Sequence, residues 1–358
     1  MGCDRSCHPT RHRRCLNNLD RRGCGVKIVS HVIAWTVGLS LVVSVAVPAG
    51  AQPIKIKAVF PAIDAQYLPA SLAQSRGFFK EEGLDVELIV MRGGTLGVQA
   101  VVGGNVDFVM QFGSVFPAVW NGADLKILAQ MTNALFFSLI VRPEIQKIED
   151  LKGKKIGVTV GAITFAAVRE LLKLNGIDPD KGVEYVNIPG SGAKVAALEK
   201  GLIAATPIAP PGELRSIRAG YKRLVFFGNV LPEMSFTGLV ATNRYIRENP
   251  KTVERMVRAI VRGTYLARND SAAAIGAMQG QMKMGADDAR ETYRLIQRSF
   301  NPNLNEAGVR TTAELVASSL GAKPNKDPRD YIDLSFLNRL TSDLWKNGAR
   351  QEERNSLQ

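Results

Sequence analysis

The feature that most constrains the fold of this chain is an alternation of short apolar runs with helical patterns, from Gln52 to about Phe227. This order predicts an α/β protein in which each apolar run is a strand. The first cycle begins at Ile54–Phe60 and continues to Phe137–Arg142, and a second cycle begins at Lys154–Val160. We therefore expect two α/β lobes of similar plan.

After one more expected strand, Phe236–Thr242, the pattern is helical to the end of the chain. Asn249 and Pro250 are typical of a helix start, because Asn is favoured at the cap and Pro at the first helical position. A helical tail without a sheet of its own must pack on an existing core, and we expect it on the first lobe. The expected lobes are residues 52–139 with 239–358, and residues 140–238.

The first 51 residues have the order of a secretory signal peptide. Basic residues precede an apolar run at Val32–Val47, and Ala49-Gly50-Ala51 follows as a small-residue cleavage motif. The apolar run is shorter than the roughly 20 residues that a membrane-spanning helix needs. We expect cleavage after Ala51 and a periplasmic protein. An uncleaved anchor is the alternative, and translation from Val26 would give a signal peptide of more usual length.

All four cysteines and all three histidines lie before Ala51. The remainder cannot form Ser-His-Asp triads, Cys-His pairs or imidazole metal sites. Ser191 and Lys194 match an S-x-x-K pattern, but the S-D-N and K-T-G partner motifs are absent. Gly190-Ser191-Gly192 lacks the third glycine of a dinucleotide fingerprint. We expect no cofactor, no metal and no enzyme, with a Lys/Ser-based enzyme as a remote alternative.

The net charge of the chain is +13, and it is +8 after Ala51. The basic residues are mixed with acidic ones and form no stripe with interleaved aromatic residues, so we expect no nucleic-acid binding. A solvated basic surface is the simplest interpretation, and a general attraction for small anions is the functional one.

Glycine and hydroxyl residues recur where expected strands lead into expected helices. The three loops are Gly93-Gly94-Thr95, Gln111-Phe112-Gly113-Ser114 and Gly161-Ala162-Ile163-Thr164. Free backbone N–H groups at a helix start, together with a hydroxyl, suit a carboxylate or sulfonate, and such junctions line the ligand crevice of open α/β sheets. Because the loops come from both lobes, we expect a shared cleft. Alternatively, Thr95, Ser114 and Thr164 are plain helix caps.

The segment Leu72–Leu88, with Gly77-Phe78-Phe79 and Gly83-Leu84-Asp85-Val86, resembles a family signature. Three later segments are similar to the same family in order and spacing: Gln99–Phe108, Gly122–Lys126 and Asp150–Val158. The family is that of the substrate-binding proteins of nitrate, sulfonate and taurine ABC importers, the NMT1/THI5-like proteins, which also include binders of pyrimidine precursors. The resemblance covers roughly Ile54 to Thr242.

The resemblance implies a two-lobed α/β fold of the periplasmic-binding-protein type (type II), with hinge strands near Ser138–Arg142 and Phe236–Thr242. It implies a monomer that captures a small, anionic organic molecule by hinge closure and delivers it to an inner-membrane ABC permease. A sensor that reports its ligand to a membrane receptor is the alternative. The ligand-binding residues we expect are Asp64, Gln66, Gly94, Thr95, Gln111, Gly113, Ser114, Gly161, Ile163, Thr164 and Pro207.

The sequence departs from the family pattern at Ala204, where family members usually carry an acidic residue. The following stretch contains Pro207, Pro210 and Pro211. We expect this stretch to form a stiff, apolar wall that faces the ligand, which would suit an organic acid.

Overall fold

The computed structural model describes residues 52–231, 234–304 and 306–346, with side chains to residue 340. These residues belong to the larger of the two units into which the chain divides, residues 51–358. The expected signal peptide, residues 1–51, lies outside the described residues. No helix within them is long and apolar enough to cross a membrane.

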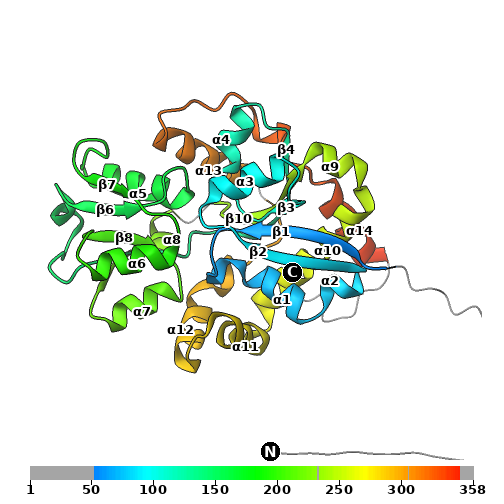
Figure 1. Ribbon diagram of the computed structural model, residues 1–358, viewed down its shortest axis with the longest axis horizontal. Coiled ribbons are helices and arrows are strands. Elements are labelled where there is room, and N and C mark those ends of the chain that lie inside the picture. Colours follow the sequence, from blue (N-terminus) through cyan, green and yellow to red (C-terminus); the bar gives the residue numbers. More distant parts are fainter. Residues whose placement is uncertain (1–51, 232–233, 305, 347–358) are drawn as a thin grey trace, which may run out of the picture. The chain divides into compact units, whose positions relative to one another are not determined.

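Two five-stranded mixed sheets form the framework of the described chain (Figure 1). The first sheet has the order β2-β1-β3-β10-β4. Its strand β1 pairs in parallel with β2 and β3, whereas β10 runs antiparallel to β3 and β4. The strands of this sheet are β1 (Ile54–Phe60), β2 (Leu84–Val90), β3 (Phe108–Val109), β4 (Leu125–Thr132) and β10 (Thr237–Thr242).

The second sheet repeats this plan with the order β7-β6-β8-β5-β9. Its strand β6 is parallel to β7 and β8, and β5 is antiparallel to β8 and β9. The expected pair of α/β lobes of similar plan is therefore confirmed. The strands of this sheet are β5 (Ser138–Val141), β6 (Lys155–Val158), β7 (Glu184–Asn187), β8 (Ala205–Ile208) and β9 (Lys222–Phe226).

The chain passes between the two sheets just before each strand that we expected to be a hinge. It leaves the first sheet at Thr132 and enters the second at Ser138, and it returns to the first sheet at Thr237. Strands β5 and β10 are each hydrogen-bonded to a neighbour on both sides within their own sheets. The crossings therefore lie in the segments before these strands, because strands held on both sides have little freedom to bend.

Helices cover the sheets of both lobes. Gly77 has a φ of 77° and separates α1 from α2. Pro69 lies in the first turn of α1, where its missing N–H is tolerated. The helices up to residue 230 are η1 (Ala65–Tyr67), α1 (Leu68–Ser75), α2 (Phe78–Glu81), α3 (Gly94–Val102), α4 (Val115–Trp120), η2 (Ile148–Leu151), α5 (Ile163–Leu174), α6 (Ser191–Glu199), α7 (Gly212–Arg218) and α8 (Phe227–Val230).

The region after β10 is helical, as the sequence indicates. The apolar face of α10, which includes Val253, Met256 and Ile260, is buried in the core of the first lobe. The elements of this tail are α9 (Asn243–Glu248), α10 (Pro250–Asn269), α11 (Ser271–Met282), α12 (Ala286–Ile296), η3 (Gln297–Ser299), α13 (Glu306–Ser319), η4 (Pro328–Asp330) and α14 (Ser335–Lys346).

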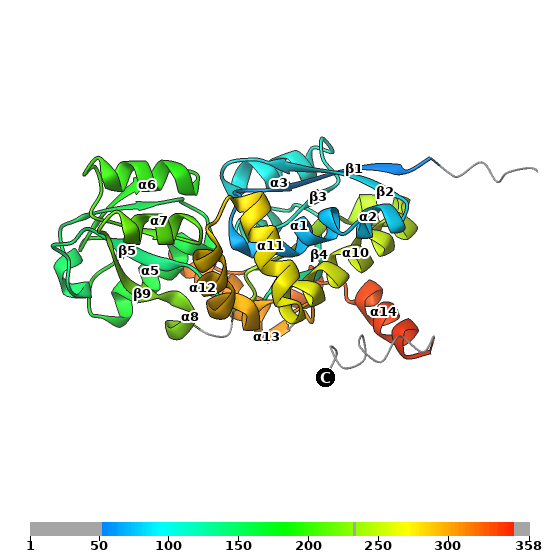
Figure 2. The same cartoon turned by 90° about the horizontal axis from the view of Figure 1, so that it is seen from below.

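The tail also contacts the second lobe, beyond our expectation that it packs on the first. Helix α13 packs against α5, and Arg218 of α7 forms an ion pair with Asp288 of α12. Met278 and Tyr293 of the tail share an apolar cluster with Phe137 from the first crossing. The tail therefore contacts the second lobe and the first crossing as well as the first sheet (Figure 2).

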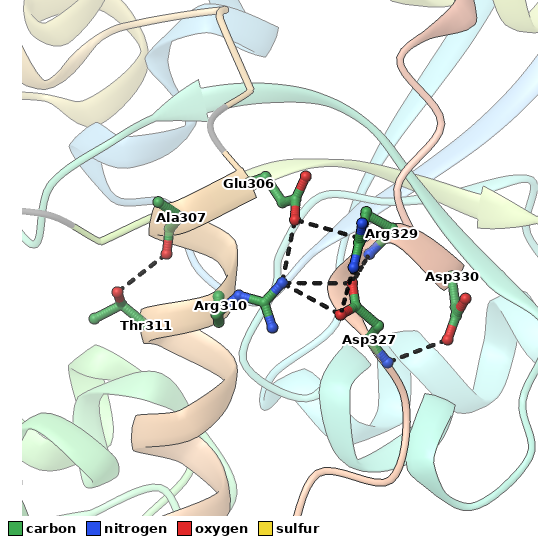
Figure 3. Close-up of polar contacts among 7 residues, drawn as sticks. All are labelled: Glu306, Ala307, Arg310, Thr311, Asp327, Arg329 and Asp330. Carbon is green, nitrogen blue, oxygen red and sulfur yellow. Dashed lines mark hydrogen bonds and ion pairs between the residues drawn. The ribbon is translucent and has the colours of Figure 1, made fainter.

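An ion-pair network joins η4, near the end of this tail, to helix α13 (Figure 3). Arg310 of α13 contacts Glu306 at 3.1 Å and Asp327 at 3.4 Å, and Arg329 of η4 contacts Asp327 at 3.0 Å. The side chain of Asp327 also accepts a hydrogen bond from the backbone N–H of Arg329, and these contacts hold the pKa of its carboxyl well below the usual range. The network closes the long loop between α13 and η4.

Candidate ligand-binding site

A cleft with a volume of about 90 Å³ lies between the two sheets. One wall comes from the first lobe, with the residues that follow β1 and β3 and the start of α3. The opposite wall comes from the second lobe, with the residues that follow β6 and β7 and the starts of α5 and α6. Each wall is thus built at the carboxyl ends of parallel strands, where open α/β sheets place their ligands.

Three helices begin at this cleft. Gly94 of α3, Ile163 of α5 and Ser191 of α6 are the first residues of their helices, and all three line the cleft. The first N–H groups of a helix have no partner within the helix, and they carry the positive end of the helix dipole. One helix start from the first lobe and two from the second therefore provide a positive environment for an anion.

Two glycines of the first lobe allow close packing at the cleft, one within its own wall and one against the opposite wall. A Cβ atom at Gly113 would lie 2.7 Å from the backbone nitrogen of Ile163 in the opposite lobe. A Cβ at Gly94 would overlap the side chains of Gln111 and Ser114. A larger residue at Gly113 would force the two walls apart, and a larger residue at Gly94 would displace Gln111 and Ser114 within the first wall.

The three expected hydroxyl residues are not side-chain caps. The helices that follow them have Gly93, Ser114 and Ala162 at the N-cap, and none of these caps makes a side-chain hydrogen bond. The Ser114 hydroxyl instead donates across the cleft to the carbonyl oxygen of Gly161, at 3.5 Å. The plain-cap alternative is therefore wrong for Ser114 and Thr164, which both line the cleft.

The structure brings most of the expected binding residues together and leaves three outside. Thr95 is exposed on α3, Gly161 contributes only its carbonyl to the Ser114 contact, and Pro207 is buried within β8. Those that line the cleft are Asp64, Gln66, Gly94, Gln111, Gly113, Ser114, Ile163 and Thr164.

The expected apolar wall at residues 204–211 does not face the cleft. Residues 205–208 form β8, which is paired on both sides in the middle of the second sheet. Pro207 lies opposite Leu139 in that pairing, so its ring is part of the lobe core. The sequence predicted a stiff stretch with three prolines here, and part of that stretch is a strand.

Lys194 is the most consequential residue of the cleft that the expected set omits. The S-x-x-K spacing places Ser191 and Lys194 three residues apart, on one face of α6, and both line the cleft. The side chain of Lys194 is only 5% exposed. The sequence pattern was visible, but nothing in it indicated that the amine would be buried. Tyr67, Thr159, Phe236 and Thr237 also line the cleft and were not expected there.

Asp64 faces Lys194 from the other lobe. Its carboxylate is 6% exposed and accepts a hydrogen bond from the Ser191 hydroxyl at 3.0 Å. Burial raises the pKa of Asp64 to about 6, against the opposing effects of the Ser191 hydrogen bond and the Lys194 charge. Burial lowers the pKa of Lys194 to about 8, and the charge of Asp64 opposes this change. Both groups are therefore mostly charged near pH 7.

Two glutamines line the wall of the first lobe beside this pair. The Gln111 amide nitrogen donates to the carbonyl oxygen of Gly94 at 2.5 Å and orients the start of α3. Gln66 is 7% exposed, and its Oε1 has no hydrogen-bond partner among the described residues. An amide oxygen buried without a partner is uncommon in folded proteins and calls for a physical explanation.

No group of three or more His, Cys, Asp or Glu side chains in the described chain is placed to hold a metal ion. The cleft offers hydroxyls, amides, helix N-termini and one opposed pair of charges. Its chemistry is that of holding a small polar molecule.

The comparison with protein families agrees with this site. The model of the NMT1/THI5-like family matches residues 64–274, more than half of the chain. The chain belongs to the NMT1/THI5-like family. The matched region includes β3, β6 and β7 and the starts of α3, α5 and α6, which build most of both walls of the cleft, and it confirms the resemblance drawn from the sequence.

For the relatives of this NMT1/THI5-like chain, the binding role is stated in their names. A protein of Brucella abortus is 30% identical over 195 residues, which are 53% of this chain and 60% of the relative. The matched part thus spans less than two thirds of that relative. YtlA of Bacillus subtilis is 26% identical over 292 residues, which are 77% of this chain and 87% of YtlA.

Solved structures share the fold at low sequence identity. A protein of Bordetella bronchiseptica is 24% identical, with a TM-score of 0.69 over 82% of this chain and 98% of its own. The alkanesulfonate-binding protein SsuA of Xanthomonas axonopodis is 15% identical, with a TM-score of 0.69 over 80% and 100%. The desulfurization enzyme DSZB is 18% identical, with a TM-score of 0.57 over 81% and 99%. The two-lobed fold of the NMT1/THI5-like chain is therefore confirmed, and this fold is found in a binding protein and in an enzyme.

Proposed function

We propose that this protein is the solute-binding component of an ABC importer, and that it captures a small, anionic organic molecule in the cleft between its lobes. The observation that carries this proposal is the convergence of the starts of α3, α5 and α6 on one cleft. Helix N-termini bind anions through free N–H groups and the helix dipole. A carboxylate or sulfonate between them would draw the two lobes together.

The names of similar proteins support this role. SsuA is an alkanesulfonate-binding protein, and the Brucella and Bacillus relatives are named for binding. We infer that the ligand contacts are the predicted residues that line the cleft, together with Lys194. We also propose that the protein acts as a monomer in the periplasm and hands its ligand to an inner-membrane permease.

We propose that the two lobes move about the crossings that precede β5 and β10, so that Ser138 and Leu139 move with the second lobe and Thr237 and Gly238 with the first. The Ser114–Gly161 and Ser191–Asp64 hydrogen bonds already join the two walls. They would add to the closed state that the ligand stabilises, and opening would break both.

Calorimetric titration of the purified protein with nitrate, ethanesulfonate, propionate and benzoate tests the proposal. We expect at least one organic anion to bind at a 1:1 ratio. Thr164→Val should weaken this binding about tenfold, because a hydrogen bond to a charged ligand contributes about 1.5–3 kcal/mol. Thr95→Val is the matched control, since both threonines are the second residue of a helix and Thr95 is exposed. Equal losses in both variants, or no binding of any anion, would contradict the proposal.

A Lys/Ser-based enzyme is the second candidate, because the cleft contains Ser191 beside Asp64 and a lysine whose pKa is lowered. A lysine with a pKa near 8 can accept a proton close to neutral pH. The Ser191 hydroxyl, however, donates to Asp64 and not to Lys194. We therefore favour binding without turnover. Hydrolysis of an ester or amide by the wild type that is lost in Lys194→Ala would favour the enzyme instead.

A further inference from the structure

We propose that the cleft selects ligands that carry a hydrogen-bond donor, an amine or a hydroxyl, in addition to their anionic group. Lys194 would contact the anion, and Asp64 with Gln66 would accept the donor. This inference rests on the proposed function and narrows its ligand class to amino acids, hydroxy acids and molecules of similar chemistry.

The buried ammonium group of Lys194 is the first observation. Among the described residues it makes no hydrogen bond or close ion pair, and the charge that acts on it is that of Asp64 in the opposite wall. An ammonium group withdrawn from water without a close partner is strongly unfavourable. A buried charge of this kind within a cleft is typical of a functional site, and an anionic ligand group would supply the missing contact.

The acceptors of the first lobe are the second observation, and they point to a different ligand group. Asp64 accepts one side-chain hydrogen bond from the described residues, that of Ser191, although a carboxylate has room for several. Gln66, two residues away in η1, has a buried Oε1 without a partner. Neither group can receive a bond from a simple anion. A donor on the ligand would satisfy both of them.

The arrangement of these groups explains why one molecule must carry both functions. Asp64 and Gln66 belong to the first lobe, whereas Lys194 belongs to the second. Without the donor, an anion beside Lys194 would leave the Gln66 Oε1 unpaired and Asp64 with the Ser191 bond alone, and an unpaired buried acceptor costs free energy. A ligand with both groups bonds to both walls and so favours closure.

The cleft leaves room for ligands of different length. A neighbouring groove of about 440 Å³ shares Asp64 and Ser191 with it and is also lined by Ile63, Val90 and Arg92. Ile63 and Val90 are exposed apolar residues. The probes should therefore include an aromatic series as well as a short aliphatic one.

The experiment is calorimetric titration of the purified protein with two matched series. One series is propionate, 3-hydroxypropionate and 3-aminopropionate, and the other is benzoate, 4-hydroxybenzoate and 4-aminobenzoate. In at least one series we expect the donor-bearing acids to bind about tenfold more tightly than the plain acid, the factor that corresponds to one hydrogen bond of about 1.4 kcal/mol.

Two variants assign this preference to residues. Gln66→Met should remove most of the preference while the plain acid binds as before, whereas Lys194→Met should weaken all acids alike. The control is Gln74→Met, the same change at an exposed glutamine of α1, which should leave all affinities unchanged. Circular dichroism would verify that each variant is folded.

The outcomes separate this inference from the proposed function. If plain acids bind as tightly as their donor-bearing partners, or if Gln66→Met preserves the preference, the inference is wrong while anion capture stands. If no acid of either series binds and no anion of the earlier panel binds, both the inference and the proposed function are wrong.

Discussion

Asp64 and Lys194 lie buried in the cleft, where both lose hydration, and each therefore lowers the stability of the ligand-free protein at neutral pH. For Asp64, the pKa difference between about 6 and the usual 3.8 corresponds to at most about 3 kcal/mol. We expect Asp64→Asn to raise the free energy of unfolding at pH 7 by about 1–3 kcal/mol, while it weakens ligand binding. Urea unfolding measures the first effect. Asp85→Asn, at an exposed position of β2, should change neither quantity.

Lys194→Met should behave in the same way, because the pKa of Lys194 falls from 10.5 to about 8 on burial. A more stable protein that no longer binds is the signature of residues kept for function and not for the fold. Lys200→Met, an exposed position at the end of the same helix, is the control. If Lys194→Met unfolds more easily than the wild type, the amine stabilises the fold through a structural partner and is not kept for ligand binding alone.

The pH dependence of stability follows from the same two groups. Between about pH 4 and pH 6 the folded state holds the Asp64 proton more tightly than the unfolded state, so the free energy of unfolding falls as pH rises. Between about pH 8 and pH 10.5 the unfolded state holds the Lys194 proton more tightly, so the free energy rises with pH. The advantage of Asp64→Asn over the wild type should therefore disappear below about pH 4. Urea unfolding across this range measures it, and an advantage that persists at pH 3.5 would contradict the assignment.

Individual residues of the cleft also show how much of the binding site the sequence can predict. The glycine and hydroxyl loops predicted a cleft and part of its lining, because helix starts after parallel strands have a fixed place in such folds. Thr95 was included wrongly, since one position along a helix turns a side chain by about 100°. Lys194 was missed because burial of an amine depends on the opposite lobe, which is distant in sequence.

Among the secondary-structure elements, β10 connects the second crossing to the first sheet. At Gly238 of this strand there is no room for a side chain. A Cβ at Gly238 would lie within 3.0 Å of the carbonyl oxygen of Ala129 and of the ring of Phe112. We expect Gly238→Ala to lower the free energy of unfolding by about 1–3 kcal/mol, because β4 and β10 would have to move apart. Gly276→Ala in α11 meets open space and should raise it by about 0.5–1 kcal/mol. Thermal unfolding of both variants measures the contrast, and equal shifts would contradict the packing described.

Most strands could be predicted from the sequence because each is a short apolar run next to a glycine turn. The strand at β8 could not, because prolines usually exclude a central strand and here Pro207 lies within one. The placement of the tail was predicted only in part. Its contacts with α5 and α7 join residues 70 or more positions apart, and hydrophobic periodicity carries no information on such pairs.

At the level of the whole molecule, the proposed function requires that the lobes close on the ligand. The walls are joined by few polar contacts, so the ligand-free protein should sample an open state. We expect the radius of gyration from small-angle X-ray scattering to fall when a bound acid is added. Ser114→Ala with Ser191→Ala should weaken binding by removing two side-chain hydrogen bonds between the walls, while the backbone bond from Ala65 to Pro210 remains. A radius that is unchanged by a ligand of proven affinity would argue against hinge closure.

The central claim is that the cleft holds a small organic anion without altering it, and proton NMR of the matched acids mixed with the protein tests this most directly. We expect the resonances of at least one donor-bearing acid to broaden in the presence of the wild type. With Lys194→Met they should stay sharp, and the spectrum of the acid should remain the same for hours. New resonances that grow with time would mean turnover, and sharp lines for every acid in the wild-type sample would mean that the cleft is not an anion site.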